Sequence, residues 1–386
     1  MTLKTASPVA ELATLNTPAL VLDELRMQAN IDRLNSRMLR LGVTLRPHLK
    51  TPKSVEVARR VMTSDAGPAA VSTLAEAEQF ALAGVRDILY AVGISAAKLD
   101  RVVALRRSGT DLTVVVDSVA AAQAVAAHSR ASGEAIPALI EIDSDGHRAG
   151  VKPHQHDLLR AIGEALEEGA ILRGVMTHAG ESYHVKDLAA VRAMAEQERR
   201  AAVDAASVLR DAGLPCPIVS VGSTPTAMFA EDLDGVTEVR AGVYVFFDLF
   251  MAGLGVCRQD EIALSVLATV IGHQPDKGWI LVDAGWMAMS RDRGTAKQAV
   301  DQYYGIVCDV YGRPLGDLVM KDANQEQGML MMRPGSRASL PDLPLGSRVR
   351  ILPNHACATG AQHDRYAVVR GETGQVVATW PRFRGW

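Results

Sequence analysis

Residues 42–51, GVTLRPHLKT, form the stretch that decides the fold. The apolar segment 42–45 predicts a β-strand, and Lys50 follows at its carboxyl end with His48 two residues before it. A lysine held at the end of a strand can be partly desolvated, and an ammonium group that loses its proton there can form a Schiff base. A surface lysine after a strand would look the same, so the rest of the chain has to decide.

Seven further apolar runs continue this pattern, and most of them precede a segment of helical periodicity. They lie at residues 69–73, 87–92, 112–117, 138–143, 172–178, 218–222 and 238–244. The runs are continuous rather than alternating, as in strands buried on both faces of a parallel sheet. Eight strand units within about 210 residues predict a (β/α)8 barrel of the TIM type. An open doubly wound sheet is the alternative, and the lack of GxGxxG after the first strand weighs against it.

The sequence changes character after about residue 255, where long helical patterns end and Gly and Pro become frequent. Strand-like runs at 263–271, 278–283 and 348–352, and a hairpin within 366–380, predict a β-rich domain. We therefore predict three parts. They are an N-terminal segment, 1–24, that pairs with the β-domain, a barrel, 25–254, and a β-domain, 255–386.

The composition argues against several classes of protein. Lys plus Arg is 41 and Asp plus Glu is 44, so a net charge of −3 gives no indication of a nucleic-acid partner. No apolar run reaches the ~20 residues that a membrane-spanning helix needs, and Met1–Thr5 lacks the apolar core of a secretory signal. The four cysteines are widely spaced and form no CxxC, which predicts reduced thiols and a cytoplasmic location.

In a (β/α)8 barrel the reacting groups lie at the carboxyl ends of the strands. Reading those ends in order gives the candidates His48, Lys50, Ser72, Thr73, Asp143, Asp145, His147, Arg148, Thr177, His178, Tyr183, Gly222, Ser223, Thr224, Pro225, Thr226, Tyr244 and Asp248.

The loop after the seventh strand, residues 222–226 (GSTPT), lies where barrels often bind phosphate. Its backbone N–H groups and the Ser223 and Thr224 hydroxyls suit an anion, although a tight Gly-Ser turn is the alternative. A Schiff-base lysine opposite a phosphate loop predicts pyridoxal 5′-phosphate (PLP) as the cofactor. Arg148 would then contact the polar edge of the ring, and a surface salt bridge is its alternative role.

A second constellation lies late in the chain, at residues 353–359 (PNHACAT). A strand has a period of two residues, so it would place His355 and Cys357 on one face. Imidazole and thiolate together suit Zn²⁺, with positions left for water and substrate. A packed cysteine beside a polar histidine is the alternative. His363 and Asp364 would either support this pair or form a surface turn.

Together, these motifs resemble the fold-type III, alanine racemase-like PLP enzymes. More narrowly, they resemble the metal-dependent group of D-serine dehydratases and D-threonine aldolases. The resemblance runs from about Thr17 to Trp386. It is carried by residues 46–51, 145–151, 177–180, 221–226, 241–248 and 353–357.

The resemblance implies that Lys50 is the Schiff-base lysine and that His355 and Cys357 bind a divalent metal, with Zn²⁺ as first choice and Mn²⁺, Co²⁺ or Mg²⁺ as alternatives. The cofactor-binding residues that it implies are Lys50, Arg148, His178, Gly222, Ser223, Thr224 and Tyr244. It also implies a homodimer, with each active site between the barrel of one subunit and the β-domain of the other.

The implied activity is that of a lyase acting on a D-3-hydroxy amino acid, such as D-threo-3-hydroxyaspartate, D-serine or D-threonine. Dehydration and deamination would give a 2-oxo acid and ammonia. Aldolases of this group typically carry His-x-Asp at the metal pair, so Cys357 favours a dehydratase. The alternatives are a D-threonine aldolase, which would release glycine and an aldehyde, an amino-acid racemase, and a PLP-binding protein without catalysis.

Overall fold

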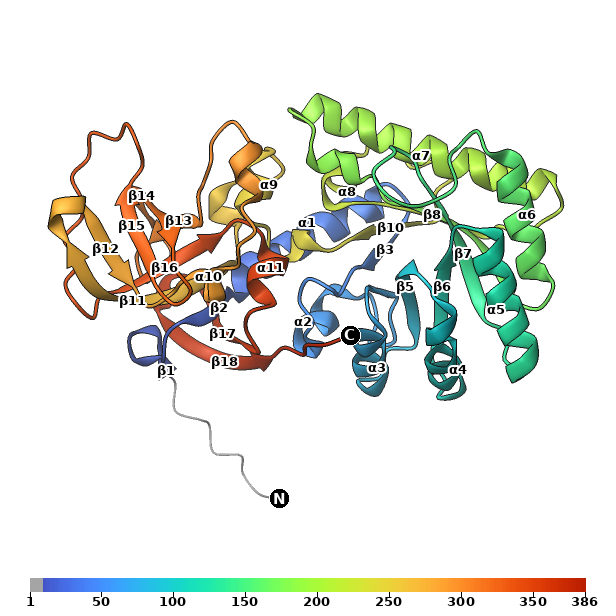
Figure 1. Cartoon of the computed structure of the whole chain (residues 1–386), viewed down its shortest axis with the longest axis horizontal. Coiled ribbons are helices and arrows are strands. Elements are labelled where there is room, and N and C mark those ends of the chain that lie inside the picture. The colour runs from blue at the N-terminus through green and yellow to red at the C-terminus, as the bar shows by residue number, and fades with distance from the viewer. Residues whose placement is uncertain (1–9) are drawn as a thin grey trace, which may run out of the picture. The chain divides into compact units, whose positions relative to one another are not determined.

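The computed structural model describes residues 10–386, so residues 1–9, including the segment Met1–Thr5 considered for a signal, lie outside the described part. The chain divides into two compact units (Figure 1). One unit, called the barrel unit, comprises Ile31–Tyr244 and Phe383–Trp386. The other, called the β-unit, comprises residues 10–30 and 245–382 of the described part. The domain boundaries predicted after residues 24 and 254 fall near these limits and stay predictions.

The barrel unit is built on an eight-stranded parallel sheet in the order β3-β10-β9-β8-β7-β6-β5-β4. A bridge between His48 and Ala70 joins its two edge strands, and the Leu49 N–H donates to the Ala70 carbonyl at 2.8 Å. The predicted (β/α)8 barrel is therefore confirmed. The strands are β3 (Thr44–Pro47), β4 (Ala69–Val71), β5 (Asp87–Gly93), β6 (Asp111–Val116), β7 (Pro137–Ile142), β8 (Ile171–Thr177), β9 (Ile218–Val221) and β10 (Glu238–Ala241).

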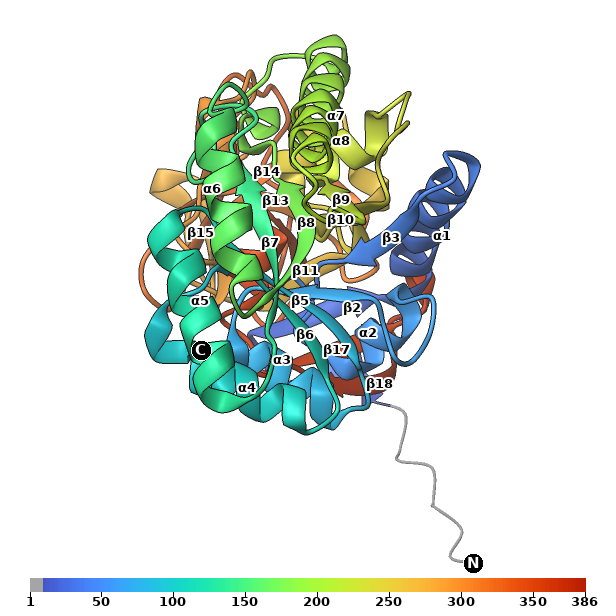
Figure 2. The same ribbon diagram turned by 90° about the vertical axis from the view of Figure 1, so that its right-hand side faces the viewer.

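Helices cover the outer face of this sheet, as Figure 2 shows for α3 to α7 around β5 to β9. Helix α5 illustrates why they form. Ser118 caps it by accepting the Ala121 N–H, Gly133 ends it at φ 69°, and it buries Ala122 and Val125. The helices are α1 (Glu24–Arg40), α2 (Val55–Val61), α3 (Leu74–Leu82), α4 (Leu99–Arg107), α5 (Val119–Ser132), α6 (His156–Glu167), α7 (Leu188–Asp211) and α8 (Thr224–Phe229).

The β-unit is a ten-stranded sheet in the order β1-β18-β17-β2-β11-β12-β15-β14-β13-β16. Strand β11 also pairs with β16, so the strands from β11 to β16 form a closed ring. The strands are β1 (Ala10–Glu11), β2 (Ala19–Asp23), β11 (Leu264–Gln274), β12 (Trp279–Val282), β13 (Gly305–Cys308), β14 (Pro314–Ala323), β15 (Gly328–Met332), β16 (Arg348–Pro353), β17 (Arg365–Val369) and β18 (Gln375–Pro381).

Strand β2 joins the N-terminal segment to the β-unit, since it pairs antiparallel with β11 and parallel with β17. The sequence pattern missed β13, β14 and β15. Strand β14 buries little more than its centre, so its hydrophobic signal is short. Three short helices connect the strands: α9 (Leu249–Gly253), α10 (Trp286–Met289) and α11 (Ala356–Gly360). Across residues 10–386, no helix combines the length and the apolarity that crossing a membrane requires.

Candidate active site

Lys50 lies just beyond the barrel strand that introduces it. Strand β3 ends at Pro47, the His48 N–H donates to the Ala241 carbonyl at 2.7 Å, and Lys50 follows in a turn with an exposed side chain. The strand end is therefore fixed on both sides, by β10 and by the bridge to β4. The partial desolvation expected for Lys50 is not found, because the residue is exposed among the described residues.

Two neutral histidines belong to the electrostatic surroundings of Lys50. Burial, together with the positive charge of Lys50, holds the pKa of His48 well below its usual range. Burial also lowers the pKa of His178 to about 3, with Arg148 adding to the effect. His178 Nδ1 lies 3.0 Å from the Gly222 carbonyl, so this nitrogen carries the proton and Nε2 remains an acceptor.

His48 contacts both the backbone of Lys50 and the second strand end. Its Nδ1 lies 3.5 Å from the Lys50 backbone nitrogen, and its Nε2 lies 3.5 Å from Ser72 Oγ. These contacts place His48 beside the Lys50 turn.

The loop after β9 offers hydroxyl groups in two different situations. Ser223 is occupied by the protein, because it forms a capping box with Thr226 and its Oγ lies 2.8 Å from Ser182 Oγ. The Thr224 and Tyr244 hydroxyls are buried, and neither has a hydrogen-bond partner among the described residues. An unpaired buried hydroxyl costs about 1–3 kcal/mol. Two of them among the predicted phosphate-binding residues fit a phosphate that supplies the missing acceptors.

Gly222 permits the close packing of this loop. Its φ is +129°, and a Cβ at this position would lie 2.2 Å from the Arg240 carbonyl oxygen. A side chain is therefore excluded both by the backbone conformation and by space.

Glu198 is a residue of this site that the sequence reasoning missed. It is buried on α7, and its Oε1 accepts the N–H groups of both Ala179 and Gly222 at 2.9 Å. One carboxylate thus ties the end of β8 to the end of β9. Burial raises its pKa, against the opposing effect of its hydrogen bonds. An acidic residue in the alanine-rich buried face of α7 was the available signal.

Arg148 follows β7 and is half-exposed, with Nη2 3.6 Å from Glu141 Oε1. Glu141 is buried, and burial raises its pKa despite the nearby Arg148. Arg148 also lowers the pKa of His178, so the Arg148 and His178 side chains belong to the same part of the rim.

The structure corrects the geometry predicted for the His-x-Cys pair. Strand β16 ends at Pro353, His355 is the N-cap of α11, and Cys357 lies inside that helix. The argument from strand periodicity is therefore wrong. The two side chains are still neighbours, because the His355 ring is hydrogen-bonded to the Cys357 side chain across the first turn of the helix.

Asp292 and Asp248 support this pair. The Asp292 Oδ2 lies 2.6 Å from His355 Nδ1. The buried Asp248 accepts the Ala356 N–H with Oδ2 and the Met251 N–H with Oδ1, both at 2.9 Å. Asp248 was expected on the barrel rim, but it belongs to the β-unit and fixes the start of α11.

The charge of His355 follows from these neighbours. Burial alone would lower its pKa, but the hydrogen bonds to Asp292 and to Cys357 outweigh burial and raise it to about 11. A carboxylate on Nδ1 leaves Nε2 available and is the usual support of a metal-bound imidazole. The donor set of one imidazole and one thiol thus fits a metal of zinc type, whose binding would release protons. His363 instead lies with Nε2 3.0 Å from the Ala288 carbonyl of α10.

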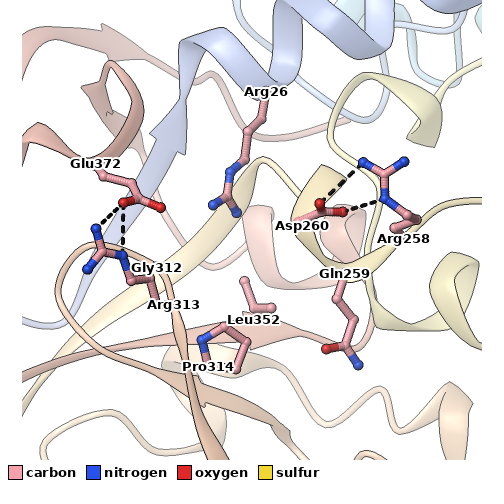
Figure 3. Close-up of a pocket in the computed structure, with 9 residues that line it drawn as sticks. All are labelled: Arg26, Arg258, Gln259, Asp260, Gly312, Arg313, Pro314, Leu352 and Glu372. Carbon is pink, nitrogen blue, oxygen red and sulfur yellow. Dashed lines mark hydrogen bonds and ion pairs between the residues drawn. The ribbon is translucent and has the colours of Figure 1, made fainter.

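A pocket of about 440 Å³ in the β-unit, drawn in Figure 3, contains none of these residues. Arg258 pairs with Asp260 at 2.9 Å, and Arg313 pairs with Glu372, with Nε 2.8 Å from Oε2. The charged side chains that line this pocket are therefore largely paired within the protein. None of the predicted site residues lines it.

The fold and the family matches define an alanine racemase-like PLP enzyme. A family model described as "Alanine racemase, N-terminal domain" matches residues 22–249, and a serine dehydratase domain model matches residues 263–369. The chain belongs to the alanine racemase N-terminal domain family. The resemblance inferred from the motifs is confirmed.

Individual relatives narrow this class. The chain is 57% identical over 378 residues to D-threo-3-hydroxyaspartate dehydratase of Delftia sp. (strain HT23), covering 97% of this chain and 99% of the relative. It is 29% identical over 374 residues to a D-threonine aldolase of an Arthrobacter species, covering 95% of this chain and 92% of the relative. A solved structure of a D-threo-3-hydroxyaspartate dehydratase mutant in the metal-free form matches with a TM-score of 0.94 and 56% identity, covering 98% of this chain and 100% of that one.

Proposed function

We propose that this chain is a PLP- and divalent-metal-dependent dehydratase of D-3-hydroxy amino acids. It would convert D-threo-3-hydroxyaspartate, and D-serine or D-threonine, to a 2-oxo acid and ammonia. The observation that carries the proposal is the His355–Cys357 pair with its Asp292 support in a chain that also carries PLP-binding residues. The similarity to D-threo-3-hydroxyaspartate dehydratase supports the choice of first substrate.

Lys50 is the residue to which we assign proton transfer. It would hold PLP covalently and, once released by substrate, take the Cα proton on the face that a D-amino acid presents. PLP supplies an electron sink for the carbanion that this step creates. His48 and His178 are neutral, so neither adds positive charge beside the lysine.

The Thr224 and Tyr244 hydroxyls would donate to the cofactor phosphate, because the protein offers them no other partner among the described residues. Ser223 and Glu198 hold the backbone of the same loop, through the capping box and through the Gly222 N–H. The cofactor would therefore meet a loop whose shape is set before it binds.

His355 and Cys357 would hold the metal, which supplies a Lewis acid for the departing β-hydroxyl group. Asp292 keeps the proton of the imidazole on Nδ1 and so leaves Nε2 for the metal. Asp248 holds the Ala356 N–H at the start of α11, between the two ligands.

Product analysis tests this function directly. The purified enzyme, loaded with PLP and Zn²⁺ or Mn²⁺, is incubated with D-threo-3-hydroxyaspartate and with D-threonine, using the L-isomers as controls. We expect ammonia and a 2-oxo acid, from the D-isomers only, and loss of this activity after EDTA treatment. Release of glycine and an aldehyde would refute dehydration, and turnover unaffected by EDTA would refute the role of the metal.

We also infer a homodimer whose active sites combine the barrel unit of one subunit with the β-unit of the other, in a cytoplasmic enzyme without nucleic-acid or membrane partners. The family resemblance supports this assembly. Co-expression of Lys50→Ala and Cys357→Ser chains, each inactive alone, tests it. Shared sites would restore about a quarter of the activity, because half of randomly formed dimers gain one intact site. Sites within one chain would restore none.

A further inference from the structure

Three side chains of metal-binding type meet on the barrel unit, and none of them is a residue that the proposed function uses. His147 lies in the loop after β7, and Glu181 and His184 lie in and directly after the 3-10 helix η3 (Gly180–Tyr183) that follows β8. Their ligand atoms all lie within 4.8 Å of one another, and no other such group of three occurs in residues 10–386. We call these three residues the rim cluster.

Glu181 lies between the two imidazoles of the rim cluster. Its Oε1 lies 2.8 Å from His147 Nδ1, and its Oε2 lies 3.5 Å from His184 Nδ1. The centroids of the two imidazole rings are 5.8 Å apart. The hydrogen bond from His147 lowers the pKa of Glu181, so the carboxylate is ionised at neutral pH. A single histidine would satisfy an ordinary ion pair, whereas here each carboxylate oxygen faces its own imidazole.

The backbone holds this arrangement in place. Asp145 accepts the His147 N–H with Oδ1 at 3.2 Å and the Glu181 N–H with Oδ2 at 2.9 Å, so one carboxylate ties the two loops together. Gly180 makes room for the imidazole, because a Cβ there would lie 2.2 Å from His147 Cδ2. Two of the three ligands therefore have a fixed backbone, and the third, His184, follows within the same short segment.

Two imidazoles and one carboxylate form a ligand set suited to divalent first-row transition ions. Zn–N and Zn–O distances of about 2.0–2.2 Å place the ligands of one ion roughly 3.3 Å apart in a tetrahedron. The present spread of up to 4.8 Å is wider than this, but all three side chains are exposed, so they can close on an ion without disturbing the core.

We propose that His147, Glu181 and His184 form a second metal site, which takes a divalent transition ion such as Zn²⁺ and is separate from the His355–Cys357 pair. The ion would join the loop that carries Arg148 to the segment that carries Tyr183, whose ring centroid lies 6.2 Å from that of His178. Occupation of the rim cluster would therefore stiffen the part of the rim beside the cofactor residues.

The metal content of tag-free variants tests this site independently of catalysis. The background variant is His355→Ala/Cys357→Ala, which lacks the other metal pair. We expect about two Zn²⁺ per chain for the wild type by equilibrium dialysis and elemental analysis, and about one for the background variant. Adding His184→Ala to the background should abolish binding. Adding His154→Ala, an exposed histidine of the same loop, should leave it unchanged.

Co²⁺ gives a second readout that identifies the ligands. Co²⁺ bound to the background variant should show d–d absorption without a thiolate charge-transfer band, because the rim cluster contains no sulfur. Hydrogen exchange at residues 144–150 and 180–184 should slow when Zn²⁺ is added to the background variant, and not in the His184→Ala derivative.

Three results would overturn the proposal. They are a background variant that binds no ion, undiminished binding after His184→Ala, or exchange at these loops that does not respond to Zn²⁺. His184→Gln and the thermal unfolding temperature of each variant separate loss of a ligand from loss of the fold.

Discussion

The barrel rim and the His355 pair differ in how their side chains are positioned: strand ends position the first, and loops position the second. On the rim, Lys50, His178 and Gly222 follow the strands β3, β8 and β9 of one parallel barrel, so strand order places them at the same end of that barrel. Around His355, the supporting carboxylates Asp292 and Asp248 come from loops 63 and 108 residues away from the groups that they contact. A regular sheet therefore lets the sequence predict which residues lie together, whereas the carboxylates that support the His355 pair could not be assigned to it from the sequence.

The largest expected effect is a loss of turnover that involves the barrel rim and leaves the His355 pair unchanged. Lys50→Ala should lower turnover at least about 10³-fold, because both the covalent link to PLP and the proton acceptor are lost. The visible absorbance of PLP bound to lysine should disappear, while the metal content at His355 and Cys357 stays the same. Lys152→Ala, at an exposed position of the barrel unit, is the matched control. Absorbance that survives in Lys50→Ala would contradict the assignment.

The second prediction addresses the other region. Asp292→Asn should weaken metal binding about 10–100-fold. The variant loses the carboxylate that orients the His355 ring and raises its basicity. PLP binding should be unchanged. Competition with a chelator measures the metal affinity, and Asp276→Asn, at an exposed position of the same unit, is the control. An unchanged metal affinity would mean that Asp292 only pairs with the histidinium.

The third prediction compares two buried tyrosines. Tyr244→Phe removes a hydroxyl that has no partner within residues 10–386, so the stability of the PLP-free protein should stay equal or rise by up to about 1 kcal/mol. PLP affinity should fall by about tenfold, as expected for one lost hydrogen bond. Tyr366→Phe should instead destabilise the PLP-free protein, because its hydroxyl accepts the Arg382 Nε–H at 2.8 Å. Urea unfolding with and without PLP measures both effects.

If Tyr244→Phe destabilised the PLP-free protein as much as Tyr366→Phe does, its hydroxyl would have a structural partner. The assignment to the phosphate would then fail. Equal PLP affinity in Tyr244→Phe and wild type would lead to the same conclusion.

The smallest effect at neutral pH concerns His178. Its pKa of about 3 in the folded protein lies below the usual 6.5, so the unfolded chain binds an extra proton between these values. Its contribution to stability is therefore complete above about pH 6.5 and is lost as the pH falls toward 3, with a slope of at most about 1.4 kcal/mol per pH unit. His178→Gln should flatten this part of the urea-midpoint profile, whereas His154→Gln should not. If the urea midpoint of His178→Gln changed with pH in the same way as that of the wild type, the assignment of a buried neutral imidazole would be contradicted.

Several parts of the site were readable from the sequence because they depend on local order. Continuous apolar runs identified the eight strands, and strand order then placed Lys50, Arg148, His178 and the 222–226 loop on one rim. Glu198 was missed because its partners, Ala179 and Gly222, become neighbours only when β8 and β9 pair with α7 packed against them. The geometry of the His-x-Cys pair was misjudged because the chain leaves β16 two residues before His355.

By itself, the sequence determined the barrel and the β-rich second unit, and it supplied the residues that we propose for the reaction. Periodicity, burial and functional groups are properties of neighbouring residues, so a linear chain already contains them. Tertiary structure alone decided which groups are paired. It left the hydroxyls of Thr224 and Tyr244 without a partner in the described part of the chain, gave His355 its carboxylate, and brought His147 to Glu181 and His184. Pairing depends on distances between segments far apart in the chain, and these exist only after the sheets have closed.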